Sequence, residues 1–424
     1  MTEHSSAKNE REILVIGGGA AGMAAALFAA AEGKRVTLLE KNEKLGKKIY
    51  ITGKGRCNCT NLCDTDAFLR EVPRNPRFLY SALKTLSPED FLSLLRSLGC
   101  ETKIERGRRA YPVSDHASDV TKALERGLRQ AGVRLRFHAE VKRLLTGENG
   151  VEGVELASSE RLAARAVIVC TGGLSYPSTG STGDGLRWAA ETGHPLSPCR
   201  PSLTGLETEE AWPARLQGLT MKNICLNARF CGKMIYSEQG ELLFTHYGVS
   251  GPLALECSAH LPPEKKADLT LDLKPALTEE QLDARLIREL AAGGKKQLRT
   301  VMQTLLPLRF AALFPELLGV DGAQPCSQVS AKTRAALARG LKALPLAVRD
   351  VRGYNEAVVT RGGVDVKSLN AATMESRRVP GLYFAGEVID VDAHTGGYNL
   401  QIAWSTGALA GKSAARAAAE RAFD

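Results

Sequence analysis

Three glycines at the end of an apolar segment have the spacing of a nucleotide-binding turn. Gly17, Gly19 and Gly22 follow the strand-like residues 13–16 and open an alanine-rich helix. In such a turn the first glycine permits a sharp bend, the second lets the backbone approach a pyrophosphate, and the third lets the helix pack on the sheet. The helix N-terminus adds free N–H groups and the positive end of a dipole. The pattern predicts a dinucleotide site, and a glycine-rich turn in an ordinary βαβ unit is the alternative.

An acid and two further glycine junctions extend this pattern. Glu40 ends the next predicted strand about 20 residues after the glycines, where a ribose-binding carboxylate is expected. Residues 166–170 form a buried strand that runs into Thr-Gly-Gly, and residues 381–387 form a short strand that ends at a glycine and an acid. Residues 394–400, with two glycines, open a final helix. Such strand ends are the places where α/β sheets bind ligands.

The composition is that of a globular protein. The chain has 424 residues, of which 44% are hydrophobic and 24% charged, and this length suggests two or three domains. No apolar run is long enough to span a bilayer, and residues 1–11 lack the apolar stretch of a secretion signal. We therefore expect a cytoplasmic protein that makes no membrane contact.

The formal net charge of +9 has several possible causes. Nucleic acid, an anionic substrate or solubility alone can each account for it. The densest basic cluster, residues 41–56, lies beside the predicted nucleotide turn, where phosphates would explain it. The cluster Arg106-Gly107-Arg108-Arg109 has no such explanation. We expect a small-molecule substrate rather than a nucleic-acid partner, and the sequence does not predict the oligomeric state.

Ten cysteines are scattered along the chain. Without a secretion signal, buried free thiols are the default. Cys57 and Cys59, with Cys63 close by, are the exception, but their spacing and the lack of a second pair do not fit a zinc site. A disulfide between Cys57 and Cys59 would be strained. The sequence predicts no metal site.

A change in residue pattern marks an inserted region. It begins at the proline-rich residues 195–201, continues with strand-like segments, and becomes helical from Thr278, which forms a capping box with Gln281. Ser87 and Ser330 stand at two further expected helix starts. We expect one nucleotide-binding domain made of two parts, residues 1–195 and 346–424. Two subdomains are inserted between these parts, a β-rich one at residues 196–275 and a helical one at residues 276–345.

Several segments together carry a resemblance to a known family. They are residues 52–61 (TGKGRCNCTN), 111–115 (YPVSD), 171–173 (TGG), 182–185 (TGDG), 244–252 (FTHYGVSGP), 361–364 (RGGV), 386–390 (GEVID) and 396–401 (GGYNLQ). In this order they resemble the BaiN/YhiN-like family of NAD(P)/FAD-dependent oxidoreductases. More distantly, the chain is similar to the fumarate reductase and succinate dehydrogenase flavoproteins. Residues 392–394, Asp-Ala-His, depart from the glycine expected there, which weakens any inference about His394.

The resemblance implies an α/β fold with a Rossmann-like FAD-binding domain of the glutathione-reductase type, formed by both chain ends around the insert. It also implies non-covalent FAD. The residues implied to hold the adenosine and pyrophosphate half are Gly17, Gly19, Ala21, Gly22, Glu40, Lys41, Lys47, Val141, Thr171 and Gly172. Those implied to border the flavin end are Gly53, Arg56, Cys57, Asn58, Gly386, Glu387, Gly397, Tyr398, Asn399 and Leu400.

An oxidoreductase of this kind passes hydride between the flavin and a small organic substrate. We expect reduction of an activated carbon–carbon double bond, with NAD(P)H as a transient donor that docks in the substrate cleft, because the sequence holds no second nucleotide motif. Candidates for catalysis or substrate binding are His246, Tyr247, Arg361 and His394, each of which also has a purely structural interpretation. A peroxide-forming amine oxidase and a nucleic-acid-linked flavoprotein are the alternatives.

Overall fold

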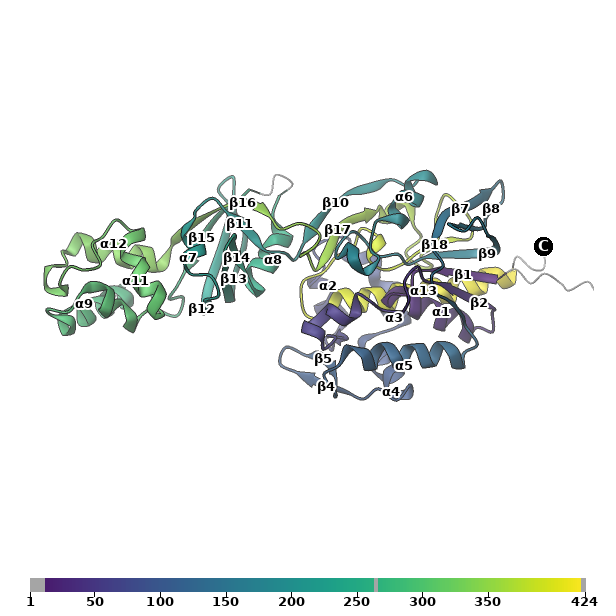
Figure 1. The fold of residues 1–424 in the computed structure, drawn as a ribbon, viewed down its shortest axis with the longest axis horizontal. Coiled ribbons are helices and arrows are strands. Elements are labelled where there is room, and N and C mark those ends of the chain that lie inside the picture. The colour runs from purple at the N-terminus through teal and green to yellow at the C-terminus, as the bar shows by residue number, and fades with distance from the viewer. Residues whose placement is uncertain (1–11, 263–265, 421–424) are drawn as a thin grey trace, which may run out of the picture. The chain divides into compact units, whose positions relative to one another are not determined.

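The computed structural model describes residues 12–262 and 266–420 (Figure 1). Residues 1–11, on which the expectation of no secretion signal rests, lie outside the described residues. The chain divides into two compact units, unit 1 with residues 1–201 and 357–424, and unit 2 with residues 202–356. No described helix is both long enough and apolar enough to cross a lipid bilayer.

A seven-stranded sheet forms the centre of unit 1, in the order β6-β2-β1-β9-β8-β7, with β18 paired on β9. Its parallel strands are β1 (Glu12–Ile16), β2 (Val36–Leu39), β6 (Arg134–Arg136), β9 (Arg161–Val169) and β18 (Leu382–Phe384). The antiparallel strands are β7 (Val141–Gly147) and β8 (Gly150–Leu156). Buried residues predominate in β1, β2, β18 and the second half of β9, as is typical of parallel strands in the centre of a sheet, whereas the edge strand β6 is polar. Since β18 joins β9, both chain ends build one sheet, which confirms the predicted fold class.

Helices pack on this sheet and on one another (Figure 1). They are α1 (Ala20–Ala31), α2 (Thr65–Arg70), α3 (Tyr80–Thr85), α4 (Pro88–Ser97), α5 (Ala117–Gln130), α6 (Asp184–Glu191) and α13 (Tyr398–Glu420). The two chain ends pack closely, because a Cβ at Gly407 or Gly411 of α13 would lie 2.2 or 2.1 Å from a backbone oxygen of α1. The predicted cap at Ser87 is confirmed, since its side chain accepts from Asp90 N in a capping box.

Smaller elements surround the main sheet of unit 1. A three-stranded sheet has the order β3-β5-β4, and a two-stranded sheet joins β10 to β17. The strands are β3 (Thr60–Asn61), β4 (Thr102–Glu105), β5 (Arg109–Pro112), β10 (Leu196–Ser202) and β17 (Val359–Val364), and the 3-10 helices are η1 (Ile49–Gly55), η2 (Pro76–Leu79), η3 (Pro177–Thr179), η6 (Val366–Ser368) and η7 (Gly386–Val388). Residues 196–201, expected in the insert, belong to unit 1 because β10 pairs with β17.

Unit 2 contains a closed barrel in the order β11-β14-β13-β12-β15-β16. Its strands are β11 (Leu206–Thr208), β12 (Thr220–Phe230), β13 (Lys233–Thr245), β14 (Gly248–Ser250), β15 (Asp268–Asp272) and β16 (Leu344–Val351), accompanied by α7 (Trp212–Arg215) and α8 (Pro252–His260). Residues 346–351, expected in the second part of the FAD-binding domain, are instead barrel residues. The reason is that β16 closes the barrel by pairing with both β15 and β11.

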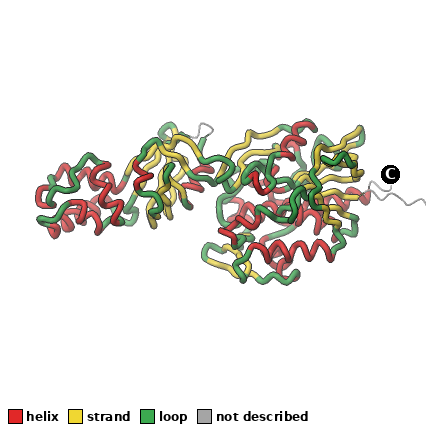
Figure 2. Tube along the Cα trace, viewed as in Figure 1, coloured by secondary structure: helices red, strands yellow, loops and turns green. Residues whose placement is uncertain are grey.

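The helical part of unit 2 lies between β15 and β16 in sequence. It consists of α9 (Glu279–Gly293), α10 (Leu298–Val301), η4 (Met302–Thr304), α11 (Leu308–Leu317), η5 (Cys326–Gln328) and α12 (Ala331–Lys342). Figure 2 shows these helices gathered at one end of the unit and the strands at the other. The capping box of Thr278 and Gln281 is present, and Ser330 accepts from Thr333 N at the start of α12.

Candidate functional site

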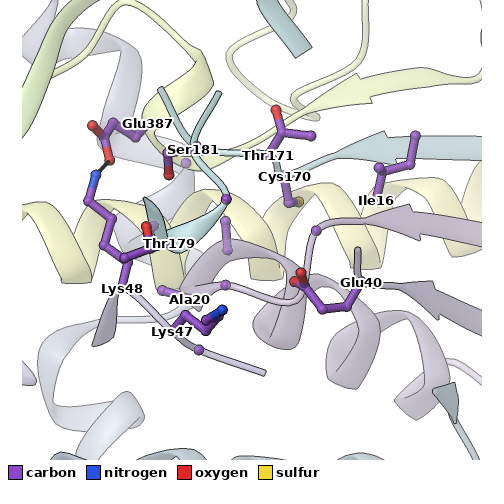
Figure 3. Close-up of a pocket in the computed structure, with 18 of the residues that line it drawn as sticks. Ile16, Ala20, Glu40, Lys47, Lys48, Cys170, Thr171, Thr179, Ser181 and Glu387 are labelled. Carbon is purple, nitrogen blue, oxygen red and sulfur yellow. Dashed lines mark hydrogen bonds and ion pairs between the residues drawn. The ribbon is translucent and has the colours of Figure 1, made fainter. Parts of the chain in front are cut away.

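Unit 1 contains a cleft at the carboxyl ends of β1, β2, β9 and β18. It holds about 1300 Å³ of space, part of it open to solvent. Its lining includes thirteen residues expected from the sequence: Gly17, Gly19, Ala21, Glu40, Lys41, Lys47, Val141, Thr171, Gly172, Gly386, Glu387, Asn399 and Leu400. In Figure 3, Glu40 lies towards one end of the labelled group, and Lys48 with Glu387 towards the other. An elongated cleft built from both chain ends fits a dinucleotide.

The glycine turn between β1 and α1 has the geometry of a phosphate site. Gly17 has φ +99°, and a Cβ there would lie 2.5 Å from the Cys170 carbonyl oxygen. Gly22 packs the helix, because its Cβ would lie 1.8 Å from Gly17 O. At Gly19, in contrast, a Cβ would meet no atom within 4 Å. Gly19 is the N-cap residue of α1 and has no side chain that could bond the free N–H groups of the first turn. These groups therefore face open space in the cleft, as binding of an anion requires.

Glu40 is buried and held rigidly in the cleft wall. Its Oε2 accepts from Gly18 N at 2.7 Å, and its Oε1 accepts from Asn42 N at 2.8 Å and Asn42 Nδ2 at 2.7 Å. These three donors fix the carboxylate plane at the edge of the glycine turn. A carboxylate oriented in this way beside a phosphate turn suits a ribose hydroxyl.

Three lysines of one segment line the cleft. Lys41 Nζ pairs with Asp184 at 2.9 Å, and Lys47 Nζ pairs with Glu43 at 3.2 Å. Lys48 Nζ donates to Ser175 Oγ at 2.5 Å and to Glu387 Oε2 at 2.7 Å. The basic run 41–56 of the sequence therefore places ammonium groups at the cleft, each paired with a carboxylate, and a pyrophosphate would bind them in competition with these partners.

Glu387 is the centre of a network that joins both halves of unit 1, and Figure 3 shows its ion pair with Lys48. Besides Lys48, its carboxylate accepts from Ser175 Oγ at 2.7 Å and from Thr360 N at 2.8 Å. Burial alone opposes ionisation of this carboxyl, but the Lys48 charge and these hydrogen bonds outweigh burial and lower the pKa of Glu387. Thr360 Oγ1 accepts from Leu174 N and Ser175 N at 2.7 and 3.0 Å, which fixes the loop after β9.

One polar atom near the glycine turn has no hydrogen-bond partner among the described residues. This atom is Thr171 Oγ1, a buried hydroxyl that belongs to a residue of the cleft lining. Buried hydroxyls are normally hydrogen-bonded. This hydroxyl lies beside Gly185, at the start of α6. The carboxylate of Glu40, the lysines and the open glycine turn fit a bound dinucleotide such as FAD.

Six expected cofactor residues lie outside the cleft lining, in addition to Gly22. They are Gly53, Arg56, Cys57, Asn58, Gly397 and Tyr398. Arg56 pairs with Glu105 and with Asp115, the latter at 2.7 Å, and covers the Tyr111 ring at 4.1 Å. Its charge is therefore already balanced, and no motif in the sequence pointed to these partners.

The two neighbouring cysteines are buried thiols. Cys57 Sγ and Cys59 Sγ are 3.8 Å apart and form no disulfide. Proximity to the Cys57 thiol, together with burial, raises the pKa of Cys59. Gly397 packs on the same segment, because its Cβ would lie 2.5 Å from the Thr60 backbone. These residues support the start of α13 rather than line the cleft. No described cluster of His, Cys, Asp or Glu is suited to a metal ion.

The cleft also contains residues that the sequence analysis did not single out. The polar ones are Asn42, Lys48, Thr52, Glu140, Thr179, Ser181 and Asp184, and the apolar ones include Ile16, Ile49, Trp188, Val358 and Val359. Lys48 lay within the basic run and Asp184 within the segment 182–185, so both had a signal. No sequence signal indicated Val358 and Val359, because they reach the cleft only through the position of β17 in the fold.

The four catalytic candidates lie in different places. Arg361 is on β17, two residues after the cleft residue Val359, and burial lowers its pKa while the Asp392 charge opposes this. His394 Nδ1 lies 3.0 Å from Glu71 Oε2. His246 and Tyr247 belong to unit 2, where the Tyr247 ring lies under the Arg352 guanidinium at 4.6 Å.

Comparison with known proteins gives a family. The model of the HI0933-like protein Rossmann domain matches residues 11–413. A 3-dehydro-bile acid delta(4,6)-reductase of Clostridium scindens is 34% identical over 409 residues, which cover 95% of this chain and 98% of that protein. A ribosomal RNA dihydrouridine synthase of Haemophilus influenzae is 33% identical over 400 residues, which cover 93% of this chain and 96% of that protein.

Solved structures agree with this fold. A quinol-fumarate reductase with menaquinol molecules has a TM-score of 0.53 at 15% identity, covering 97% of this chain and 72% of that one. This likeness concerns the fold alone. The family model, the two relatives and the cleft lead to one conclusion: the chain belongs to the HI0933-like, BaiN/YhiN-type family of Rossmann flavoprotein oxidoreductases.

Proposed function

We propose that this chain binds FAD non-covalently in the unit 1 cleft and reduces a carbon–carbon double bond conjugated with a carbonyl group, with NADH or NADPH as electron donor. The observation that carries the proposal is the uncapped N-terminus of α1 at Gly19, which faces an open cleft built from both chain ends. Bound FAD would supply a hydride carrier next to the substrate.

The proposed cofactor contacts follow from the cleft. Gly17, Gly19 and Ala21 would present backbone N–H groups to the pyrophosphate, and Glu40 would accept from the adenosine ribose. Lys48 and Glu387, which lie away from Glu40 in Figure 3, would border the flavin half. The N-terminus of α13, whose Asn399 and Leu400 line the cleft, would stabilise negative charge on the reduced ring.

The names of the two relatives support the reaction class. A delta(4,6)-reductase of a 3-dehydro bile acid and a synthase of dihydrouridine both describe hydrogen added to a double bond conjugated with a carbonyl group. Such a reduction places a hydride on one carbon and a proton on the other, while charge develops on the carbonyl oxygen. We propose that Arg361 stabilises that oxygen and that His394, held by Glu71, handles the proton. His246 and Tyr247 stay candidates for substrate binding.

The test is anaerobic mixing of the purified flavoprotein with NADH and NADPH in turn, followed by a cyclic enone. We expect one nucleotide to bleach the flavin absorbance and the enone to restore it, with the saturated ketone as product. Bleaching by amines with peroxide release in air, and no recovery with any enone, would overturn this proposal in favour of an amine oxidase.

A variant at Gly19 supplies the control for the site. Gly19→Asp should leave the fold intact, because the new Cβ meets no atom, yet place a carboxylate where the pyrophosphate would lie. We expect a colourless variant without enone reduction and an otherwise folded chain by circular dichroism. The uncharged Gly19→Asn, of nearly equal size, should retain more flavin. A Gly19→Asp protein as yellow as the parent would place the cofactor elsewhere.

A further inference from the structure

The hairpin of β4 and β5 exposes a group of arginines that the cleft does not use. Arg106, Arg108 and Arg109 stand at its turn, and Arg70 ends the neighbouring helix α2; all four side chains are exposed. Within residues 12–262 and 266–420, none of the four forms an ion pair. We call these four residues the hairpin arginine patch.

The surroundings leave this patch positive. The other two cations of the hairpin region, Lys103 and Arg56, are neutralised by Glu105 and Asp115. Three carboxylates belong to α2 and its caps: Asp64 at the N-cap, Asp66 in the first turn and Glu71 at the C-cap. Asp64 already accepts from Ala67 N at 2.8 Å, and this hydrogen bond, with the Arg70 and Arg108 charges, lowers its pKa. Four guanidinium groups against these three acids leave a net positive charge.

The patch is held on a rigid turn. Gly107 and Arg108 have φ +75° and +59°, which bend the chain tightly between β4 and β5. Leu62 N donates to Arg108 O at 2.9 Å, and Asn61 Nδ2 donates to Gly107 O at 3.0 Å. Pairing of β3 with β5 fixes the base of the turn. A backbone that is already fixed loses no further entropy on binding, so the conformational cost is confined to the arginine side chains.

Asn61 also links the patch to the cleft. Its Nδ2 donates to Gly396 O at 3.1 Å, directly before α13. Asn399 and Leu400, in the first turn of α13, line the cleft. Asn61 pairs with Arg109 across β3 and β5, so Arg109 is the strand neighbour of the residue that contacts this turn. The patch therefore borders the redox site without belonging to it.

We propose that the hairpin arginine patch binds the phosphate backbone of an RNA strand and so holds that strand beside the redox site. Planar guanidinium groups match phosphate oxygens in bidentate pairs. A small neutral substrate would not need four exposed, unpaired arginines, whereas a polyanion does. The net charge of +9 and the ribosomal RNA relative agree with this partner. Binding of the strand does not depend on the proposed function; only reduction of a base of that strand at the cleft rests on it.

The test is binding of a fluorescent single-stranded RNA to the flavin-loaded chain over a salt series. The variant Arg106→Gln/Arg108→Gln/Arg109→Gln should bind about tenfold more weakly, and its log–log salt slope should be flatter by about 0.7 for each phosphate that the variant no longer neutralises. The matched control Arg288→Gln/Lys295→Gln/Lys296→Gln removes the same charge from exposed positions of unit 2. This control should keep nearly the parental affinity and slope.

Three outcomes would overturn the inference. They are no RNA binding by the parent, an equal reduction of binding in both triple variants, and displacement of the RNA by uridine monophosphate at similar concentration, which would indicate a site for a small anion. Enone reduction should be unchanged in the hairpin variant, because its arginines do not line the cleft. Weakened RNA binding with intact enone reduction in the hairpin variant would support the patch. Absent enone reduction with intact RNA binding in the parent would contradict the proposed function and leave the patch standing.

Discussion

Lys48 shows how single residues connect distant parts of this sequence. Its ammonium group bonds Glu387, which is 339 positions further along the chain, and Ser175, which follows β9. Both partners of the ion pair are about four-fifths buried. One cation therefore holds three segments of the cleft wall together, and its removal would leave a buried carboxylate without compensation.

We predict that Lys48→Met lowers the free energy of unfolding by about 2 kcal/mol, in line with the removal of one partner of a largely buried pair. The same substitution in a Glu387→Gln background should cost much less, because the amide needs no cation. The parent should lose this contribution as the pH falls through the lowered pKa of Glu387, since protonation removes the pair. Urea unfolding of the four proteins measures it, and equal costs in both backgrounds would contradict the coupling.

At the same scale, the sequence indicated residues whose role depends on local backbone. Gly17, Gly19 and Glu40 follow from strand, turn and helix order, and the structure places all three in the cleft. Arg56 was expected there too, but it pairs with Glu105 and Asp115 instead. Partners from distant segments are set by tertiary structure, which spacing along one chain does not reveal.

Among the elements, α1 and α13 pack closely against each other in unit 1. Gly407 and Gly411 let the backbone of α13 approach that of α1 at Ala21 and Ala25. The alanine-rich composition of both helices could be read from the sequence, and the caps at Ser87, Thr278 and Ser330 were predicted correctly because caps are local. Which two helices meet was not predictable, since small residues serve many contacts.

We predict that Gly411→Val destabilises the chain by about 3 kcal/mol, because its Cβ would lie 2.1 Å from Ala25 O and no flexible side chain can move away. Flavin should also be bound less well, as α13 carries Asn399 and Leu400 of the cleft. Ser413→Val, at a partly exposed position of the same helix, is the control for β-branching. Thermal unfolding and flavin content measure both effects. Equal behaviour of the two variants would show that the helices are not tightly packed there.

For the whole molecule, the α/β class and the use of both chain ends were predictable, because three strand-to-glycine junctions lie at the start, middle and end of the sequence. The exact division into units was not. Residues 346–351 close the barrel as part of β16, and residues 196–201 pair with β17 in unit 1. Closure of a barrel depends on pairing between strands that are far apart in the chain, so composition alone cannot locate its last strand.

Global stability should fall in mild acid through His194. This buried side chain bonds Ser376 Oγ through Nε2 at 2.7 Å, and burial, together with the Arg378 charge, lowers its pKa. In the unfolded chain the imidazole takes up a proton near pH 6.5, about the ordinary pKa of histidine. In the folded chain it takes up the proton only at lower pH. Stability is therefore complete above about pH 6.5 and decreases as the pH falls towards the lowered pKa.

We predict that His194→Gln is less stable than the parent at neutral pH but has a flatter decline between about pH 6.5 and 5. His116→Gln, at an exposed position, should keep the parental pH profile. Denaturant unfolding at a series of pH values measures this difference. Parallel profiles for the parent and His194→Gln would exclude a role for this histidine in acid sensitivity.

The pairing of β18 with β9 has a consequence for how the protein is made. While the ribosome is still adding residues 358–403, the first part of the chain lacks one wall of the cleft and the helix that closes it. A flavin could therefore be held in the complete cleft only after these residues have been made. In cells short of riboflavin, we expect chains that have folded with an empty cleft and are therefore colourless.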